Sequence, residues 1–145
     1  MTKRLSLSIV IPTKDRRELL FKSLKFLNKN FFFFNEIIIV DSSLNIINER
    51  DLKTSYRKSN IKYFTSKPST SMQRNLGLKN VRKKNKFVMF LDDDIRFNND
   101  ALKKMYRFIN KINNNIIGIG FNSITTVGHE KNLLERIKNS SFFSK

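Results

Sequence analysis

Short apolar runs rich in β-branched residues recur along this chain, and they constrain its fold more than any other feature. Residues 6–12 (SLSIVIP) are the first, and their length and composition are typical of a strand that is buried on both faces. None of the runs approaches the roughly 18 residues of a membrane span. Similar runs predict four further strands, at residues 36–40, 61–64, 86–91 and 116–121.

Helical patterns lie between these strands. After the first strand, Leu20, Leu24 and Leu27 recur at helical spacing, and Asp15 stands three residues before Glu18, as in a capping box. Further helices are expected at residues 72–81, capped by the hydroxyl groups of residues 68–71, at 100–112 and at 130–138. Strands that alternate with helices predict one α/β domain over residues 1–145, with a mostly parallel sheet and right-handed crossovers.

The composition suits a folded domain but does not decide its partner. Hydrophobic residues make up 39% of the chain, too many for a disordered protein, and the absence of cysteine excludes disulfides and thiolate metal sites. Lys and Arg number 29 against 12 Asp and Glu, and a charge of +17 is usual in proteins that bind nucleic acid, anionic lipid or phosphorylated ligands. The chain is also crowded with Asn, Ile and Phe, however, and this joint bias also arises from an A/T-rich genome.

Carboxylates follow three of the predicted strands at the point where each strand ends. Asp15, Asp41 and the triplet at residues 92–94 occupy these positions. The carboxyl ends of parallel strands share one edge of the sheet, where ligands bind in α/β folds. Side chains two residues apart in an extended segment point the same way, so Asp92 and Asp94 are expected to face one ligand. Such oxygen donors suit Mg²⁺ or Mn²⁺, although a solvated loop would show the same triplet.

Arg74 and Asn75 supply the complementary charge and polarity. They fall in the first turn of the helix expected at residues 72–81, and helix N-termini attract phosphate groups. An arginine there adds a forked cation that matches phosphate oxygens, although an ordinary surface arginine would look the same in the sequence. Together with the carboxylates, these residues suit a nucleoside diphosphate.

Four segments of the chain resemble motifs of family 2 glycosyltransferases with the GT-A fold, in the family's order and spacing. They are residues 8–16 (SIVIPTKDR), 36–43 (EIIIVDSS), 71–77 (SMQRNLG) and 87–95 (FVMFLDDDI), and they cover roughly residues 6–125. The resemblance implies a Rossmann-like GT-A three-layer sandwich. It also implies that the chain holds the nucleotide-sugar-binding part and stops before the acceptor-binding half.

The resemblance assigns the base-binding residues. Pro12 and Thr13 are expected to line a pocket for uridine or guanosine, with Asp15 close by. Asp41 is expected to hydrogen-bond the base. Residues 42 and 43 are both serine where the family more often has a glycine-containing turn, so the preferred base stays open.

The resemblance also assigns the diphosphate and metal region. Arg74 is expected to approach the diphosphate, and Asn75 to support its loop. Asp92 is expected to contact the ribose or sugar and the metal, Asp93 to belong to the same donor-binding segment, and Asp94 to hold Mn²⁺ or Mg²⁺.

The reaction that the resemblance implies is an inverting, metal-assisted transfer. A nucleoside-diphosphate sugar, UDP- or GDP-linked, would donate its sugar to a hydroxyl of a glycan or lipid-linked acceptor. Such a protein is expected in the cytoplasm, with peripheral association at the inner face of the membrane. The family's general base lies on a later segment, and His129 and Glu130 do not match its motif. The catalytic base is therefore unknown, and donor binding without efficient transfer is an alternative.

Other functions leave signatures that this chain lacks or shows weakly. A sugar nucleotidyltransferase would carry a glycine-rich loop after its first strand, and a dinucleotide enzyme would carry G-x-G-x-x-G there. Neither motif follows residues 6–12. A basic nucleic-acid-binding module remains an alternative because of the charge and the 14 phenylalanines, although no signature of such a module is present and no nucleic acid is expected as partner. An inactive glycosyltransferase fragment is the other alternative.

Overall fold

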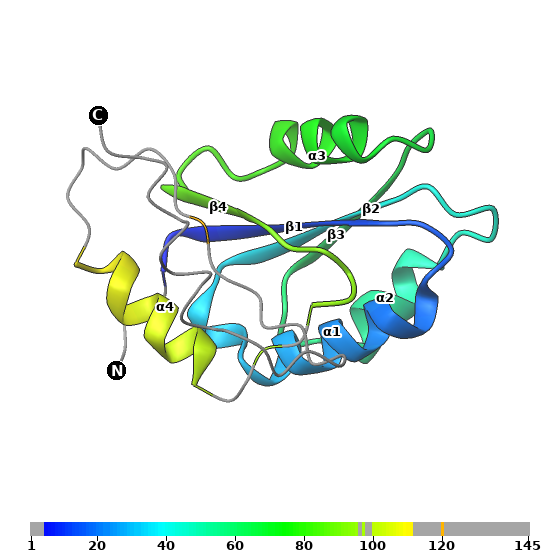
Figure 1. Cartoon of the computed structure of the whole chain (residues 1–145). Coiled ribbons are helices and arrows are strands. Elements are labelled where there is room, and N and C mark those ends of the chain that lie inside the picture. Colours follow the sequence, from blue (N-terminus) through cyan, green and yellow to red (C-terminus); the bar gives the residue numbers. More distant parts are fainter. Residues whose placement is uncertain (1–4, 96, 98–99, 112–119, 121–145) are drawn as a thin grey trace, which may run out of the picture.

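The computed structural model describes residues 5–95, 97, 100–111 and 120, and these residues form a parallel sheet between two layers of helices (Figure 1). The sheet has the strand order β3-β2-β1-β4, and every neighbouring pair is parallel. The chain adds β2 and β3 on one side of β1 and then crosses to place β4 on the other, so strand order reverses beside β1. The strands are β1 (Leu7–Thr13), β2 (Glu36–Asp41), β3 (Ile61–Thr65) and β4 (Phe87–Phe90).

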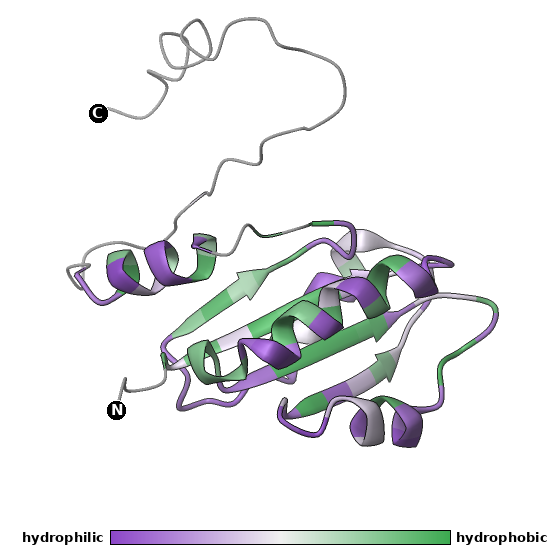
Figure 2. Ribbon diagram, turned by 90° about the horizontal axis from the view of Figure 1, so that it is seen from below, coloured by the Kyte–Doolittle hydropathy of each residue, from purple (hydrophilic) through white to green (hydrophobic). Residues whose placement is uncertain are grey.

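Helices cover both faces of the sheet. In Figure 1, α3 lies on one face, whereas α1, α2 and α4 lie on the other. Figure 2 looks onto the second face, where α1 lies over the sheet. Its leucines Leu20, Leu24 and Leu27 are buried. The helices are α1 (Arg17–Lys29), α2 (Glu49–Ser55), α3 (Thr70–Lys79) and α4 (Ala101–Ile109), with a 3₁₀ turn at Phe31–Phe33.

The strand sequences explain why β1 and β2 lie in the middle. Both are buried along their whole length, as expected of β-branched runs in a covered parallel sheet. Successive side chains point to opposite faces, so Ile9 joins the core under α1 and Val10 joins the smaller core under α3. Gly77 lets α3 come close to the sheet, because a Cβ there would lie 2.3 Å from Cγ1 of Val10.

The sequence predicted the four described strands to within two residues, and α1, α3 and α4 with shifted ends. The hydroxyl cap of α3 is confirmed, since the Ser69 side chain accepts a hydrogen bond from the Met72 amide. α2 was not predicted, because Leu52 is its single buried residue and one apolar residue creates no period. The strand expected at 116–121, except residue 120, and the helix expected at 130–138 lie outside the described residues.

The capping box expected at Asp15 is wrong. α1 begins at Arg17, and its N-cap residue, Arg16, makes no side-chain capping bond. Asp15 instead has a positive φ of 53°, and its backbone amide donates to Oγ of Ser43 at 2.7 Å. A residue that is held in this left-handed conformation by the neighbouring loop cannot cap the helix that follows.

Among the residues described, none of the helices is long and apolar enough to cross a lipid bilayer.

Candidate functional site

The carboxyl ends of β1, β2 and β4 carry the candidate site, because the loops that follow them meet at one edge of the sheet. Thr13 and Asp41 are register partners at the ends of β1 and β2. Thr13 Oγ1 also donates to a carboxylate oxygen of Asp93, in the loop after β4, at 2.7 Å. The structure therefore brings the loops of the three expected aspartate groups to the same edge, which is the edge beside the reversal of strand order.

The aspartate triplet divides between the protein interior and solvent. Asp93 is 4% exposed, and its backbone carbonyl also accepts from Ser23 Oγ at 2.9 Å. Asp92 and Asp94 point outward, with side-chain exposures of 57% and 49%. The outward pair has the relationship expected from alternation along an extended segment, and Asp93 binds the protein instead.

Each outward carboxylate is paired with an arginine. Arg74 Nη2 lies 3.0 Å from Asp92, and Arg16 Nη1 lies 3.2 Å from Asp94 and 3.4 Å from Asp93. The Arg74 guanidinium also stands over the Phe90 ring, and its buried Nε has no hydrogen-bond partner in the described part of the chain. Asp92, Asp94, Arg16 and Arg74 therefore form one charged surface. Its carboxylates can bind a cation and its arginines can bind an anion.

This surface fits a divalent metal only if a ligand completes the coordination shell. The residues that the structure describes contain no group of three His, Cys, Asp or Glu side chains placed to hold a metal. Mg²⁺ and Mn²⁺, however, are commonly held by one or two carboxylates together with substrate phosphates and water. Asp92 and Asp94 are two outward-facing carboxylates of this kind.

A cavity of about 300 Å³ lies beside the charged surface, at the ends of β1 and β2. Asp41 contributes a carboxylate to the cavity wall, although the residue as a whole is only 1% exposed to solvent. Pro12 is buried in β1 opposite Val40. It does not line the cavity, whose wall begins at Thr13. The lining residues are Thr13, Asp15, Arg17, Asp41, Ser43, Asn45 and Ile47.

Hydrogen bonds surround the Asp41 carboxylate. Oδ1 accepts from the amide of Ser43 at 2.8 Å and from its hydroxyl, and Oδ2 accepts from the Tyr63 hydroxyl at 2.7 Å. The Tyr63 oxygen in turn accepts from the Ile47 amide at 3.0 Å. Burial and the adjacent Asp41 raise the pKa of Tyr63 to about 12, so this hydroxyl keeps its proton at neutral pH. Tyr63 was not predicted as a site residue, because no motif around it distinguishes it from a core aromatic.

Gln73 is a second residue that the sequence did not single out. Its side chain is 4% exposed, and Nε2 donates to the carbonyl oxygens of Thr13 and Val40, both at 2.8 Å. These two hydrogen bonds therefore hold the first turn of α3 against the ends of β1 and β2. They also fix the position of Arg74, the next residue. Asn75 is exposed on α3, and His129 and Glu130 lie outside the described residues.

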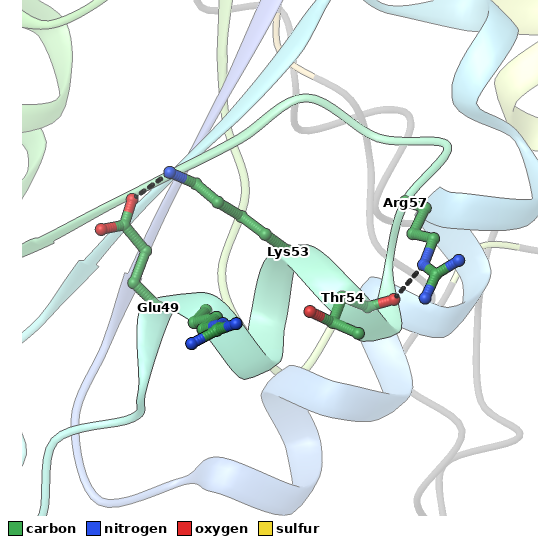
Figure 3. A pocket seen from close by; sticks show the side chains of 5 residues that line it. Glu49, Lys53, Thr54 and Arg57 are labelled. Atoms are coloured by element: carbon green, nitrogen blue, oxygen red, sulfur yellow. Dashed lines mark hydrogen bonds and ion pairs between the residues drawn. The ribbon is translucent and has the colours of Figure 1, made fainter.

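A larger cavity, of about 460 Å³, lies on α2 and away from the strand ends (Figure 3). Its exposed side chains are partly paired locally: Lys53 binds Glu49 at 2.8 Å, and Arg57, just after the helix, donates from Nε to the Thr54 carbonyl at 3.2 Å. Its wall therefore consists of exposed side chains on and just after α2 and contains no buried polar group. The smaller cavity is the better ligand site because buried, oriented groups line it. The wall of the larger one comprises Glu49, Arg50, Lys53, Thr54 and Arg57.

Comparisons with known proteins agree with this geometry. The family model described as glycosyl transferase family 2 matches residues 8–145. Among solved structures, the crystal structure of S. aureus TarS is similar, with 27% identity and a TM-score of 0.56 over 72% of this chain and 19% of that chain. The crystal structure of S. aureus TarS 1–349 is similar at 26% identity and a TM-score of 0.55, over 72% of this chain and 32% of that chain. This chain thus spans a third or less of either TarS chain, and no curated protein sequence matches it.

Proposed function

Because this chain belongs to glycosyl transferase family 2 and has a GT-A-type α/β fold, we propose that it binds a nucleoside-diphosphate sugar for inverting transfer to an acceptor hydroxyl. One observation carries the proposal. Two outward carboxylates, Asp92 and Asp94, are each paired with an arginine from a different element, and they lie at the strand edge that also holds the Asp41 cavity. This edge offers one place for a base and another for a charged diphosphate.

The two places divide the donor between them. The base enters the cavity beside Thr13 and Asp41, with Asp15 at its wall. The diphosphate lies over the charged surface, where phosphate oxygens replace Asp94 as the partner of Arg16 and Asp92 as the partner of Arg74. Asp93 keeps Arg16 in place during this exchange, because Asp93 is buried and also held by Thr13. Asn75, which is exposed next to Arg74 on α3, supports the segment that carries Arg74.

Asp92 and Asp94 would hold a Mn²⁺ or Mg²⁺ ion, with Asp92 also near the ribose or sugar. When bound, such an ion supplies positive charge to the diphosphate oxygens. The residues of the chain do the rest of the positioning: Arg74 stands over Phe90 and faces the diphosphate from the start of α3.

Transfer forms one bond and breaks another at the anomeric carbon. The acceptor oxygen attacks that carbon from the side opposite the diphosphate, and the sugar–phosphate C–O bond breaks with its electron pair on the diphosphate. Arg16 and Arg74 stabilise the negative charge that develops there. The acceptor proton goes to a general base, which we do not assign to any described residue. Donor binding is thus the part of the reaction that these residues perform.

We propose a glycan or lipid-linked acceptor and a cytoplasmic location at the inner membrane face. Exposed cations support peripheral attachment, since anionic lipids attract basic surfaces. The helices α1 and α4 cover the same face of the sheet, and their exposed lysines are Lys22, Lys25, Lys29, Lys103 and Lys104. The nucleic-acid alternative has less support, because most of the described phenylalanines pack into or against the core, whereas Phe32, Phe90 and Phe108 are exposed. Phe33 and Phe34 are buried, and Phe21, Phe26 and Phe31 pack against them or their neighbours.

Calorimetric titration of UDP and GDP, each with and without Mn²⁺, tests the proposal. The folded wild type should bind at least one nucleotide more tightly with Mn²⁺, and Asp94→Ala should lose that metal dependence. Asp51→Ala is the matched control, since Asp51 is an exposed carboxylate on α2, away from the strand ends. If the wild type shows a cooperative thermal transition but binds neither nucleotide, the donor site is wrong and the inactive fragment becomes the better account.

A further inference from the structure

Asp93 stands between the two outward carboxylates, so the contacts that hold Asp93 decide how Asp92 and Asp94 point. Its side chain accepts from Thr13 Oγ1 at 2.7 Å, and its backbone carbonyl accepts from Ser23 Oγ at 2.9 Å. The carbonyl of Asp93 belongs to the planar peptide group that leads to Asp94. The bond from Ser23 therefore fixes the direction in which the chain continues to Asp94, which the side-chain bond from Thr13 does not.

Ser23 is a polar residue in an otherwise apolar stripe. The buried residues of α1 are Leu20, Ser23, Leu24 and Leu27, and their spacing is that of one helix face. A hydroxyl that is buried on such a face lowers stability unless it finds a hydrogen-bond partner. A serine within a helix commonly donates to a carbonyl of its own preceding turn. Ser23 donates instead to the aspartate loop (residues 91–95), 70 positions away, where the chain after β4 meets α1 (Figure 1).

The helix α1 contacts the aspartate loop at two points. Nη1 of its N-cap residue, Arg16, lies 3.2 Å from a carboxylate oxygen of Asp94 and 3.4 Å from one of Asp93. Ser23 lies about two helical turns further along, and its hydroxyl is also 3.4 Å from the carbonyl oxygen of Ile95. Because one helix carries both residues, α1 sets the position of the aspartate loop relative to the arginine that pairs with it.

We propose that Ser23 is a positioning residue for the carboxylate pair, which it aims from inside the core through the peptide group between Asp93 and Asp94. The inference rests on the proposed function, because Asp92 and Asp94 are the carboxylates that would hold Mn²⁺ or Mg²⁺. Ser23 is only 8% exposed, so it acts through the loop and not by contact with the donor. Without its hydroxyl, Asp94 should take a wider range of directions, and fewer molecules should present both carboxylates to one ion.

Calorimetric titration of the wild type and Ser23→Ala with UDP and with GDP, each with and without Mn²⁺, tests this role. The quantity compared is the gain in nucleotide affinity that Mn²⁺ produces. In Ser23→Ala this gain should fall by about tenfold, or to unity where the wild-type gain is smaller, because groups that orient metal ligands contribute about that much to metal affinity. Nucleotide affinity without Mn²⁺ should stay unchanged, since Ser23 does not line the Asp41 cavity.

Two outcomes separate this inference from the proposed function. If the folded wild type binds neither nucleotide, the proposed function is wrong and the inference falls with it. If the wild type shows a gain with Mn²⁺ and folded Ser23→Ala shows the same gain, the donor site stands and the positioning role of Ser23 is wrong.

Ser59→Ala is the matched control. Ser59 is also 8% exposed, and its hydroxyl donates to Asn28 Oδ1 at 3.2 Å, just before β3 begins and away from the carboxyl ends of the strands. Both variants should lower the midpoint of thermal unfolding, because each removes a buried hydrogen bond. Only Ser23→Ala should reduce the gain with Mn²⁺. An equal reduction in both variants would trace the effect to general destabilisation and contradict the positioning role.

Ser23→Thr and Ser23→Cys separate the hydroxyl group from the size of the side chain. Threonine keeps the hydroxyl, whereas cysteine keeps a similar volume but has only a weak S–H donor. The gain in affinity with Mn²⁺ should recover in Ser23→Thr and stay low in Ser23→Cys. Full recovery in Ser23→Cys would show that side-chain volume, and not the hydrogen bond to the Asp93 carbonyl, positions the loop.

Discussion

The side-chain amide of Gln73 donates to the carbonyl oxygen of Thr13 at 2.8 Å, although 60 positions separate the two residues along the chain. A second hydrogen bond from the same nitrogen reaches Val40. Gln73 thus connects α3 to the ends of β1 and β2, which carry the cavity and border the charged surface. Placement of Arg74, the next residue, depends on this connection.

Replacing Gln73 by Met should keep the buried volume but remove both donors. We expect a loss of about 1–3 kcal/mol in the free energy of unfolding, because buried carbonyl groups lose a partner. Urea denaturation measures it. Lys79→Met, at an exposed position on the same helix, should change stability by less than about 0.5 kcal/mol. Equal stability of Gln73→Met and the wild type would show that water replaces the amide.

The two arginines should act on the diphosphate and not on the base. Arg16→Met and Arg74→Met should each weaken UDP binding by about tenfold, because each removes a charge-assisted contact to phosphate. Binding of uridine, which has no phosphate, should be unchanged. Calorimetry with both ligands separates these effects, and Arg57→Met, at an exposed position in the turn after α2, is the control. An equal loss for uridine would place these arginines at the base or in the fold.

Glu36 should make the fold sensitive to acid. It is fully buried at the start of β2, and Lys62 Nζ lies 2.9 Å from its carboxylate. Burial alone would raise the pKa of Glu36, but hydrogen bonds from the Arg82 amide, Ser8 and Lys62 hold it below its ordinary value of 4.5. Because the folded pKa is the lower one, the stabilisation is present above pH 4.5 and is lost as pH falls from there through the folded pKa.

Unfolding measured between pH 7 and pH 3 tests this assignment. The wild type should lose stability over the acidic part of the range, and Glu36→Gln should lose less of it because it has no carboxylate to protonate. At pH 7 the variant should be less stable than the wild type, since Lys62 loses its ion-pair partner. Glu18→Gln, at an exposed position on α1, should keep the wild-type pH profile. A parallel pH profile for Glu36→Gln would exclude Glu36 as the source.

Gly77 should not tolerate a side chain while Val10 is present. A Cβ at residue 77 would lie 2.3 Å from Val10 Cγ1, so Gly77→Ala forces α3 away from β1. We expect a loss of about 1–3 kcal/mol in unfolding free energy. In the double variant with Val10→Ala the two changes should compensate partly, and a double-mutant cycle measures this coupling. Simple additivity of the two losses would mean that the helix accommodates the methyl group in another way.

The sequence by itself determined where the strands lie and which edge of the sheet carries the chemistry. β-branched runs and their period are local properties, so residues 36–40 predicted β2, observed at Glu36–Asp41, without knowledge of any contact. The parallel arrangement then placed Asp41 and the aspartate triplet at the same edge. The family motifs in the sequence also agreed with the family to which the chain belongs.

Only the tertiary structure decided how the polar groups at that edge divide their bonds. Asp93 is buried because Thr13, 80 positions away, donates to it, and Asp94 faces out because Arg16 meets it from another loop. Asp15 left its expected capping role because the loop after β2 holds it. Such pairings depend on which loops become neighbours in space, and a local pattern carries no information about a partner that far along the chain.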